Sequence, residues 1–306
     1  MEISGILVSI VAPFDYHMAN GGEKLLGNAS SIKRTPDGKV YVSGQMQRHV
    51  LFSAMSRLNA ADPDRAQTYV SNGDGVSNHI EVDLRADMGG FMHPSRGDYS
   101  GRRTAPLSAT MAVALEESKV GRDLLIRLKQ DPNEDSRDQA LATREFSEND
   151  MMLMNFYLDI TSLSTSKAFR YQNSFHLETT HHKHAPEAER MRRVRLFLEA
   201  TRSLQDYSNQ ARNAVSGEPL KVLIVFDTKH SRKAARYFSV GETQQKNILA
   251  ELQSRNAQYF LGDDDTDESV FKAYEEALTL LASSTLTDLS EGDSAVMTFE
   301  EFAGRN

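Results

Sequence analysis

The sequence contains no cysteine, and this excludes disulfide bonds, zinc ribbons and thiol chemistry. No apolar run is long enough to span a membrane, and no basic region precedes the N-terminal apolar segment as it would in a signal peptide. Walker loops, nucleophile elbows, dinucleotide fingerprints and His-Glu-x-x-His motifs are missing as well. We therefore expect a cytoplasmic protein with no membrane contact, no cofactor and no catalytic residues.

The charges are distributed unevenly along the 306 residues. The net charge of −8 by itself argues against a nucleic-acid partner. Residues 163–236 nevertheless carry 14 Lys and Arg against 7 Asp and Glu, and residues 31–60 carry 5 against 1, whereas residues 237–306 carry 4 against 14. The basic segments can follow a polyanion, and the acidic end would face solvent or a basic neighbour. Ordinary variation in surface charge would give the same counts.

Apolar periodicity and turn residues predict an α+β protein. We expect strands at residues 3–11, 39–43, 151–161 and 221–227, helices at 45–58, 121–130, 187–205, 243–257 and 267–282, and polar loops at 13–31 and 131–138. Residues 59–101 are rich in Gly and turn signals and predict an insertion, while the polar residues 162–186 could form a hairpin. Strand, helix and strand, twice in succession, are the order of a ferredoxin-like unit.

Residues 43–49 indicate a helix start suited to an anion. Ser43 is a plausible cap, and free backbone N–H groups and the helix dipole favour negative charge at this end. Arg48 and His49 lie in the first turn, from which they can reach the same phosphate. A capped core helix without a ligand would show the same pattern.

Two further segments carry groups that suit phosphate. Arg102 and Arg103 are adjacent on an extended segment, so that one can pair internally while the other meets a phosphate, or both can be solvated. The predicted helix 187–205 carries three arginines that we expect to share one face, and they can bind phosphate or remain solvated: Arg192, Arg195 and Arg202.

Two clusters suggest a rival, metal-dependent nuclease. The first comprises four histidines, which can bind zinc or simply decorate a polar hairpin: His176, His181, His182 and His184. In the second, Asp263 and Asp265 can hold Mg²⁺ or cap the helix that follows. A scaffold without nucleic acid is a third reading.

In order, Gly27-Asn28, Arg34, residues 43–49, residues 102–108 and the arginine-bearing helix resemble DevR-type backbone subunits of type I CRISPR Cascade, in the Cas-seven family of the RAMP superfamily. The resemblance implies an RRM-like, ferredoxin-like palm, a helical finger insertion and a thumb hairpin. It also implies a subunit that binds guide RNA (crRNA) without cutting it. Copies would stack head to tail along that RNA.

Carried over by position, the resemblance places the palm at residues 1–58, 102–161 and 187–306, the finger at 59–101 and the thumb at 162–186. The residues that would line the RNA groove are Asn28, Arg34, Ser43, Gln45, Arg48, His49, Arg102, Arg103, Thr104, Ser108, Gln210 and Arg212. Thumb residues Phe169, Tyr171 and Phe175 could stack on bases or wedge between them. The implied partners are crRNA, the target DNA strand, further copies of the chain, a small backbone-capping subunit, a large PAM-reading subunit and a crRNA-processing endonuclease.

Overall fold

The computed structural model describes residues 1–20, 23–24, 29–73, 77–93, 101–130, 137–290 and 295–304. Its main sheet is open and has the neighbour order β15 (Gln258–Asp263), β14 (Lys221–Asp227), β2 (Gly5–His17) and β11 (Arg137–Asp159), all antiparallel to one another. Two short strands, β8 (Leu107–Ala109) and β9 (Ala112–Ala114), pair with the other edge of β11. The predicted α+β class is confirmed.

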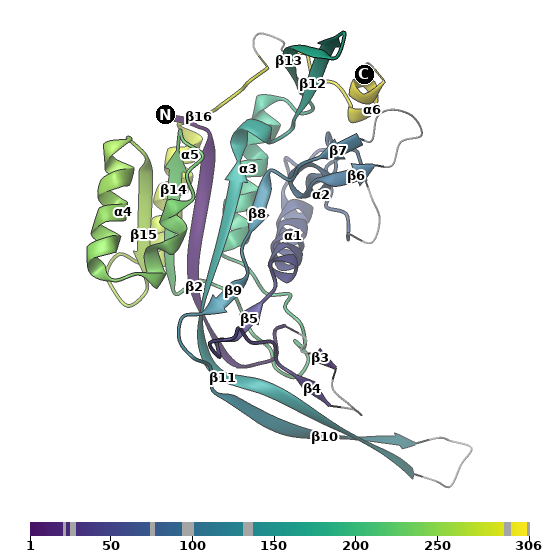
Figure 1. Cartoon of the computed structure of the whole chain (residues 1–306), viewed down its shortest axis with the longest axis vertical. Helices are drawn as coiled ribbons and strands as arrows, with labels where there is room; N and C mark the ends of the chain where they lie inside the picture. The colour runs from purple at the N-terminus through teal and green to yellow at the C-terminus, as the bar shows by residue number, and fades with distance from the viewer. Residues whose placement is uncertain are drawn as a thin grey trace.

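Helices cover both faces of this sheet. Side chains of a strand alternate between its faces, and in β2 the apolar side chains on both faces are buried. On one face Ile6, Val8 and Ile10 of β2 pack in the large core with α1 (Gly44–Ala61), α3 (Glu187–Thr201) and α5 (Val270–Ala282). On the other face Leu7 packs in a smaller core with the 3₁₀ segment η2 (Lys233–Ser239) and α4 (Glu242–Ser254). Figure 1 shows α4 beside the edge strand β15.

The order of these elements is β2, α1, β8, β11, α3 and β14 when the intervening segments are passed over. This is the β-α-β-β-α-β order that we predicted, although the RRM-like comparison itself stays a prediction. Strand β14 has the predicted bounds, and α1, α3, α4 and α5 occupy the predicted helical regions. Each of these helices buries apolar side chains at helical spacing against the sheet, such as Val50 and Ala54 of α1 and Ile248 and Leu252 of α4.

The helix predicted at residues 121–130 is wrong. These residues belong to strand β10 (Val120–Gln130), which pairs along its whole length with Arg137–Ser147 of β11. Leu124, Leu125 and Leu128 fit a helical spacing, but the long backbone ladder decides the outcome. The resulting two-stranded arm projects beyond the main sheet (Figure 1).

The loops predicted at 13–31 and 131–138 are also partly wrong. Residues 13–17 extend β2, and the short strands β3 (Glu23–Lys24) and β4 (Ser30–Ser31) follow. Residues 137–138 begin β11, whereas 131–136 lie outside the described residues. The strand predicted at 39–43 is reduced to β5 (Tyr41–Val42), which pairs with β9.

The remaining segments pack around one end of the sheet. Residues 162–186 contain the antiparallel pair β12 (Thr165–Gln172) and β13 (Phe175–Lys183). The region 59–101 contains α2 (Leu84–Gly89) and β6 (Phe91–His93), which pairs with β7 (Gly101–Arg103). The last elements are η1 (Ile160–Ser162), α6 (Phe299–Ala303), and β1 (Glu2–Ile3) paired with β16 (Thr285–Leu286).

Candidate nucleic-acid interface

The start of α1 has the anion-suited geometry that its sequence predicts. Ser43 is the N-cap, and its Oγ accepts a hydrogen bond from the backbone N–H of Met46 at 3.2 Å. Gln45 and His49 are exposed, and Arg48 is half-buried. The backbone N–H groups of the first turn and the helix dipole favour an anion at this end. Three predicted site residues therefore gather on one helix turn with the cap that orients it.

This turn forms one wall of a groove of about 770 Å³ between α1, α2 and residues 71–73. One guanidinium nitrogen of Arg48, Nη2, donates to the carbonyl oxygen of Gly89 at 2.5 Å, which fixes the side chain toward α2. Its Nε is buried and has no hydrogen-bond partner among the described residues. Burial also lowers the pKa of Arg48. The groove thus holds a partly desolvated cation with unused donor capacity, as an anion site requires.

Phe52 and Arg85 line the same groove, and sequence reasoning missed both. The guanidinium carbon of Arg85 lies 4.7 Å from the centroid of the Phe52 ring, and that of Arg48 lies 6.0 Å from it. Both distances allow cation–π attraction. Arg48 and Phe52 are four residues apart on a helix, so their contact was visible in the sequence; the approach of Arg85 depends on the tertiary fold.

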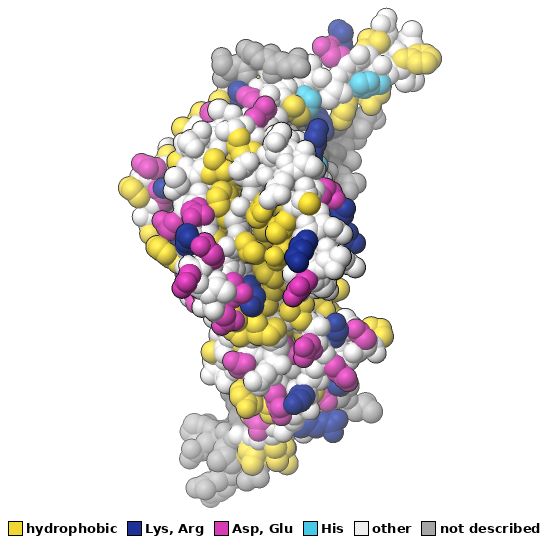
Figure 2. All heavy atoms as spheres, turned by 90° about the vertical axis from the view of Figure 1, so that its left-hand side faces the viewer, with side chains coloured by type: hydrophobic (Ala, Val, Ile, Leu, Met, Phe, Trp, Pro, Cys, Tyr) yellow, Lys and Arg dark blue, Asp and Glu magenta, His cyan; other side chains and the backbone are white. Residues whose placement is uncertain are grey.

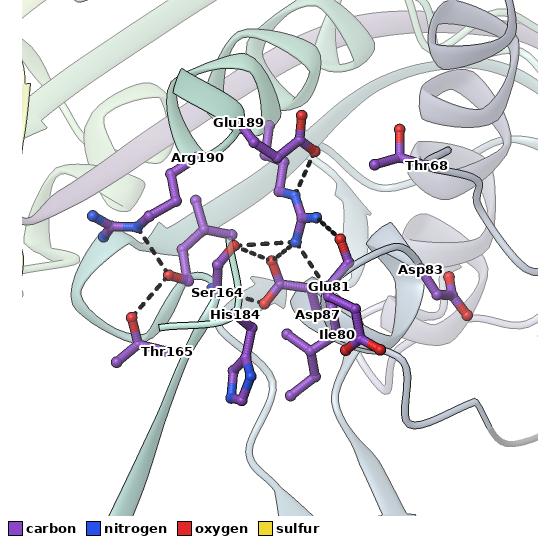
Figure 3. A network of polar contacts seen from close by, with 12 residues as sticks. Thr68, Ile80, Glu81, Asp83, Asp87, Ser164, Thr165, His184, Glu189 and Arg190 are labelled. Carbon is purple, nitrogen blue, oxygen red and sulfur yellow. Dashed lines mark hydrogen bonds and ion pairs between the residues drawn. The ribbon is translucent and has the colours of Figure 1, made fainter. Parts of the chain in front are cut away.

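A buried ionic network lies behind the groove (Figure 3). The Asp87 carboxylate is fully buried and accepts hydrogen bonds from Arg103 Nη2, Arg193 Nη1 and both the backbone N–H and the Oγ of Ser164. Burial raises the pKa of Asp87, but the charges of Arg103 and Arg193 outweigh it and hold the pKa below its usual value. The network ties α2 to β7, to α3 and to the base of the β12–β13 hairpin.

Of the two adjacent arginines, Arg103 is the one that pairs internally. Its side chain is buried and also donates to the carbonyl oxygens of Thr165 and Ser162. It is therefore not available to an RNA phosphate, and we assign it to the internal network. The side chain of Arg102 lies outside the described part of the structure.

Of the six other predicted RNA-binding positions, the five that the structure describes lie at several places. Thr104 is exposed and Ser108 is half-buried. Arg34 is partly exposed, 4.0 Å from Glu145, while Arg212 is exposed in the loop that follows α3. Gln210 stabilises that loop, because its side-chain Nε2 donates hydrogen bonds to the carbonyl oxygens of residues 205 and 215. Asn28 is outside the described residues.

The predicted basic face of α3 is wrong. Arg192 is buried and pairs with Glu189 and Asp62, and Arg195 pairs with the same Asp62 carboxylate. Arg202 pairs with Glu199 and Glu275. These arginines neutralise acids from α3 and its neighbours, because a buried guanidinium is stable only when it is paired. Helix α3 therefore supports the fold through these ion pairs.

The aromatic residues predicted to meet bases are exposed on the β12–β13 hairpin. Phe169, Tyr171 and Phe175 are 53%, 61% and 74% exposed. The ring of His176 packs edge-on between the first two, with centroids 6.1 Å and 5.7 Å away. Such a cluster of rings in solvent suits stacking on unpaired bases.

The clusters proposed for the nuclease alternative are engaged in other contacts. Asp263 pairs with Lys221 at 2.6 Å, and Asp264 accepts a hydrogen bond from the N–H of Val270, the first residue of α5, whose N-cap is Ser269. His184 is buried, with its ring nitrogens 2.8 Å and 2.9 Å from Ser166 Oγ and the carbonyl oxygen of residue 297. Within the described ranges, no group of three or more His, Asp or Glu side chains has the spacing of a metal site. Likewise, none of the described helices is both long enough and apolar enough to cross a bilayer.

Comparison with solved structures shows the same fold in two chains. A chain of a CRISPR RNA-guided surveillance complex aligns with a TM-score of 0.56 and 14% identity, over 91% of this chain and 99% of that chain. A chain of a surveillance complex described as pre-nicking aligns with a TM-score of 0.52 and 12% identity, again over 91% and 99%. None of the curated proteins matches the sequence.

The family comparison rests on the sequence itself. Residues 8–229 match the family model described as CRISPR-associated negative auto-regulator DevR/Csa2. The matched range runs from β2 to the end of β14 and includes α1, the groove and the hairpin. The chain therefore belongs to the CRISPR-associated DevR/Csa2 family.

Proposed function

We propose that this chain binds crRNA as a non-catalytic backbone subunit of a type I CRISPR surveillance complex. The observation that carries the proposal is the groove at the start of α1, where Arg48 has an unused donor beside free helix N–H groups. Membership of the DevR/Csa2 family and the fold shared with surveillance-complex chains support the same role. The acidic net charge is not an obstacle, since the phosphate-suited groups are local.

In this proposal the sugar-phosphate backbone of the guide lies along the start of α1. Ser43, Gln45, Arg48 and His49 contact it, and the groove positions Arg48. Further contacts come from outlying residues, of which Ser108 is half-buried and the others have exposed or undescribed side chains: Arg34, Arg102, Thr104, Ser108 and Arg212. Phosphate contacts of this kind position the RNA but carry no sequence information. A subunit that coats any guide needs this property.

The exposed aromatic cluster of the β12–β13 hairpin would then meet bases, and the hairpin would act as the thumb. The flanking partners in the proposal are the target DNA strand, further copies of the chain arranged head to tail, and the other subunits of the complex. An open stack of copies requires two different complementary surfaces on each copy. The nuclease alternative gains no support from the contacts of Asp263 or His184.

Co-expression with a guide RNA tests the proposal. We expect the purified wild-type chain to carry RNA, and Arg48→Glu to lose most of it, because a repulsive charge replaces a desolvated cation. Arg195→Glu is the matched control, since it makes the same charge change at an exposed arginine on α3. A wild-type chain that carries no RNA, or equal RNA retention by both variants, would contradict the proposal.

A further inference from the structure

The groove also contains an acceptor atom that none of the described residues uses. Asp83 is the N-cap of α2 and is completely buried. Its Oδ1 accepts the backbone N–H groups of Arg85 at 2.9 Å and Ser71 at 3.2 Å. Its Oδ2 has no hydrogen-bond partner among the described residues. A buried carboxylate oxygen without a donor is unfavourable and calls for a specific explanation.

The surroundings of Asp83 narrow the kind of group that could supply the donor. The same groove holds Arg48, whose Nε is also buried without a partner, and Arg85 stacked over Phe52. The phosphodiester group of a nucleic acid would satisfy the cations, but it has only acceptor oxygens to offer and would leave Oδ2 unpaired. A ligand that carries an anion and a neutral donor a few ångströms apart would satisfy both sides.

Nucleotides have this combination of groups. The phosphate lies next to the ribose 2′-hydroxyl, which donates as well as accepts hydrogen bonds. Some bases add an exocyclic amino group, and the base plane can stack on an arginine–aromatic pair. The groove volume of about 770 Å³ is ample for one nucleotide.

We propose that the groove is a ribonucleotide subsite in which Arg48 holds a phosphate and Asp83 Oδ2 accepts a hydrogen bond from the same or the adjacent nucleotide. The inference rests on the proposed function, because the nucleotide belongs to the bound RNA. It adds a residue that the sequence did not single out, and it makes the groove selective for RNA over DNA when the donor is the 2′-hydroxyl.

Asp83→Asn isolates this role. Asparagine is as good an N-cap as aspartate, so that Oδ1 keeps its two backbone bonds while a donor replaces Oδ2. We would measure the affinities of the wild type and the variant for a guide-length RNA and for DNA of the same sequence, each as a uridine- or thymidine-rich and an adenine-rich strand. Asp267→Asn is the control. Asp267 is exposed just before α5 and lies outside the groove, and its substitution makes the same charge change. Removing a negative charge strengthens all nucleic-acid binding, and the RNA-to-DNA ratio removes that effect.

We expect the RNA-to-DNA affinity ratio to fall about tenfold in Asp83→Asn, the loss of one hydrogen bond to a charged group, and to stay unchanged in Asp267→Asn. A selective loss for adenine-rich strands, in RNA and DNA alike, supports the base amino group as the donor. Equal shifts for all four strands overturn the inference and assign Oδ2 to a buried water. If Asp83→Asn does not fold, Asp83→Ser provides a cap without Oδ2 for the same comparison.

The experiments can contradict the proposed function and the ribonucleotide subsite separately. A wild-type chain that binds no RNA overturns the proposed function and the subsite together. A wild-type chain that binds RNA through Arg48, but in which Asp83→Asn shifts the affinities for all four strands equally, overturns only the subsite.

Discussion

Two clusters of arginine in this molecule differ in whether their polar atoms find partners within the chain. Behind the groove, Arg103 and Arg193 share the buried Asp87 carboxylate, and both of its oxygens accept hydrogen bonds. In the groove, the described residues provide neither an acceptor for the buried Nε of Arg48 nor a donor for Oδ2 of Asp83. The first cluster is complete in the isolated chain and stabilises it. The second is incomplete and indicates a ligand.

Surface lysines and arginines on one side of the molecule are paired with acids, like the arginines of the first cluster. Figure 2 views the side of the molecule with α4 and β15, where acidic, basic and apolar side chains are intermixed. Lysines and arginines there lie among acids, as in the pairs Lys221–Asp263 and Lys233–Glu251. Counting charges along the chain cannot separate such paired cations from the one in the groove, whereas their contacts can.

Disruption of the buried Asp87 network should have the largest effect on stability. Asp87→Ala leaves two buried guanidiniums without their acceptor, and we expect the free energy of unfolding to fall on the order of 3–5 kcal/mol. Urea denaturation measures it. Asp64→Ala removes an exposed carboxylate and should change stability little. A loss below 1 kcal/mol for Asp87→Ala would show that the network is not structural.

Acid should weaken the same end of the fold. The pKa of His184 is lowered from an ordinary value of 6.5 to about 4, chiefly because burial disfavours the charged ring; the charge of Arg103 also lowers it, while the Met297 carbonyl, Asp87 and Glu81 oppose the shift. The folded state binds a proton at His184 less well than the unfolded chain does. The contribution of neutral His184 to the free energy of unfolding is therefore present above pH 6.5 and is lost as the pH falls to 4. The loss should approach about 3 kcal/mol.

Urea denaturation at pH 7 and pH 4.5 measures that effect, and His184→Gln isolates it from the titration of carboxylates. Glutamine can bond Ser166 without titrating. The variant should lose less stability between the two pH values than the wild type does. Equal losses would contradict a buried neutral His184.

Removing the exposed rings should affect RNA binding alone. Tyr171→Ala with Phe175→Ala removes stacking worth about 1–3 kcal/mol per base, so RNA affinity should fall at least tenfold while thermal stability stays constant. Phe271→Ala, an exposed ring on α5, is the matched control. Unchanged affinity in the double variant would exclude the hairpin from the RNA path.

The smallest expected effect is at Arg212. This exposed arginine lies in a loop that is tied to β2 by Asn209 and Asn213. Arg212→Ala should lower affinity modestly and reduce the slope of log affinity against log salt by about 1. An unchanged slope would place Arg212 outside the RNA contacts.

Local signals made part of the fold predictable. Strand β14 was predicted with its observed bounds because five buried apolar residues stand between two charged ones. The start of α1 followed from the Ser43 cap. By contrast, β10 was misread because its leucines also fit a helical spacing, and only its pairing with β11 resolves the ambiguity.

The site was predictable to the same extent. Arg48 and His49 follow from a local motif, whereas for the adjacent Arg102 and Arg103 internal pairing of one was only an alternative to solvation of both. The partner of Arg103, Asp87, lies 16 residues away and has no sequence pattern that marks it. Phe52, Asp83 and Arg85 meet only when α2 packs against α1, so their groove could not be found without the tertiary structure.

Photo-crosslinking tests the central claim most directly. A guide RNA that carries 4-thiouridine would be irradiated in complex with the wild-type chain, and the linked peptides identified by mass spectrometry. We predict crosslinks to the first half of α1, around His49 and Phe52, and to the β12–β13 hairpin. Crosslinks confined to α4, α5 and β15 would contradict the account.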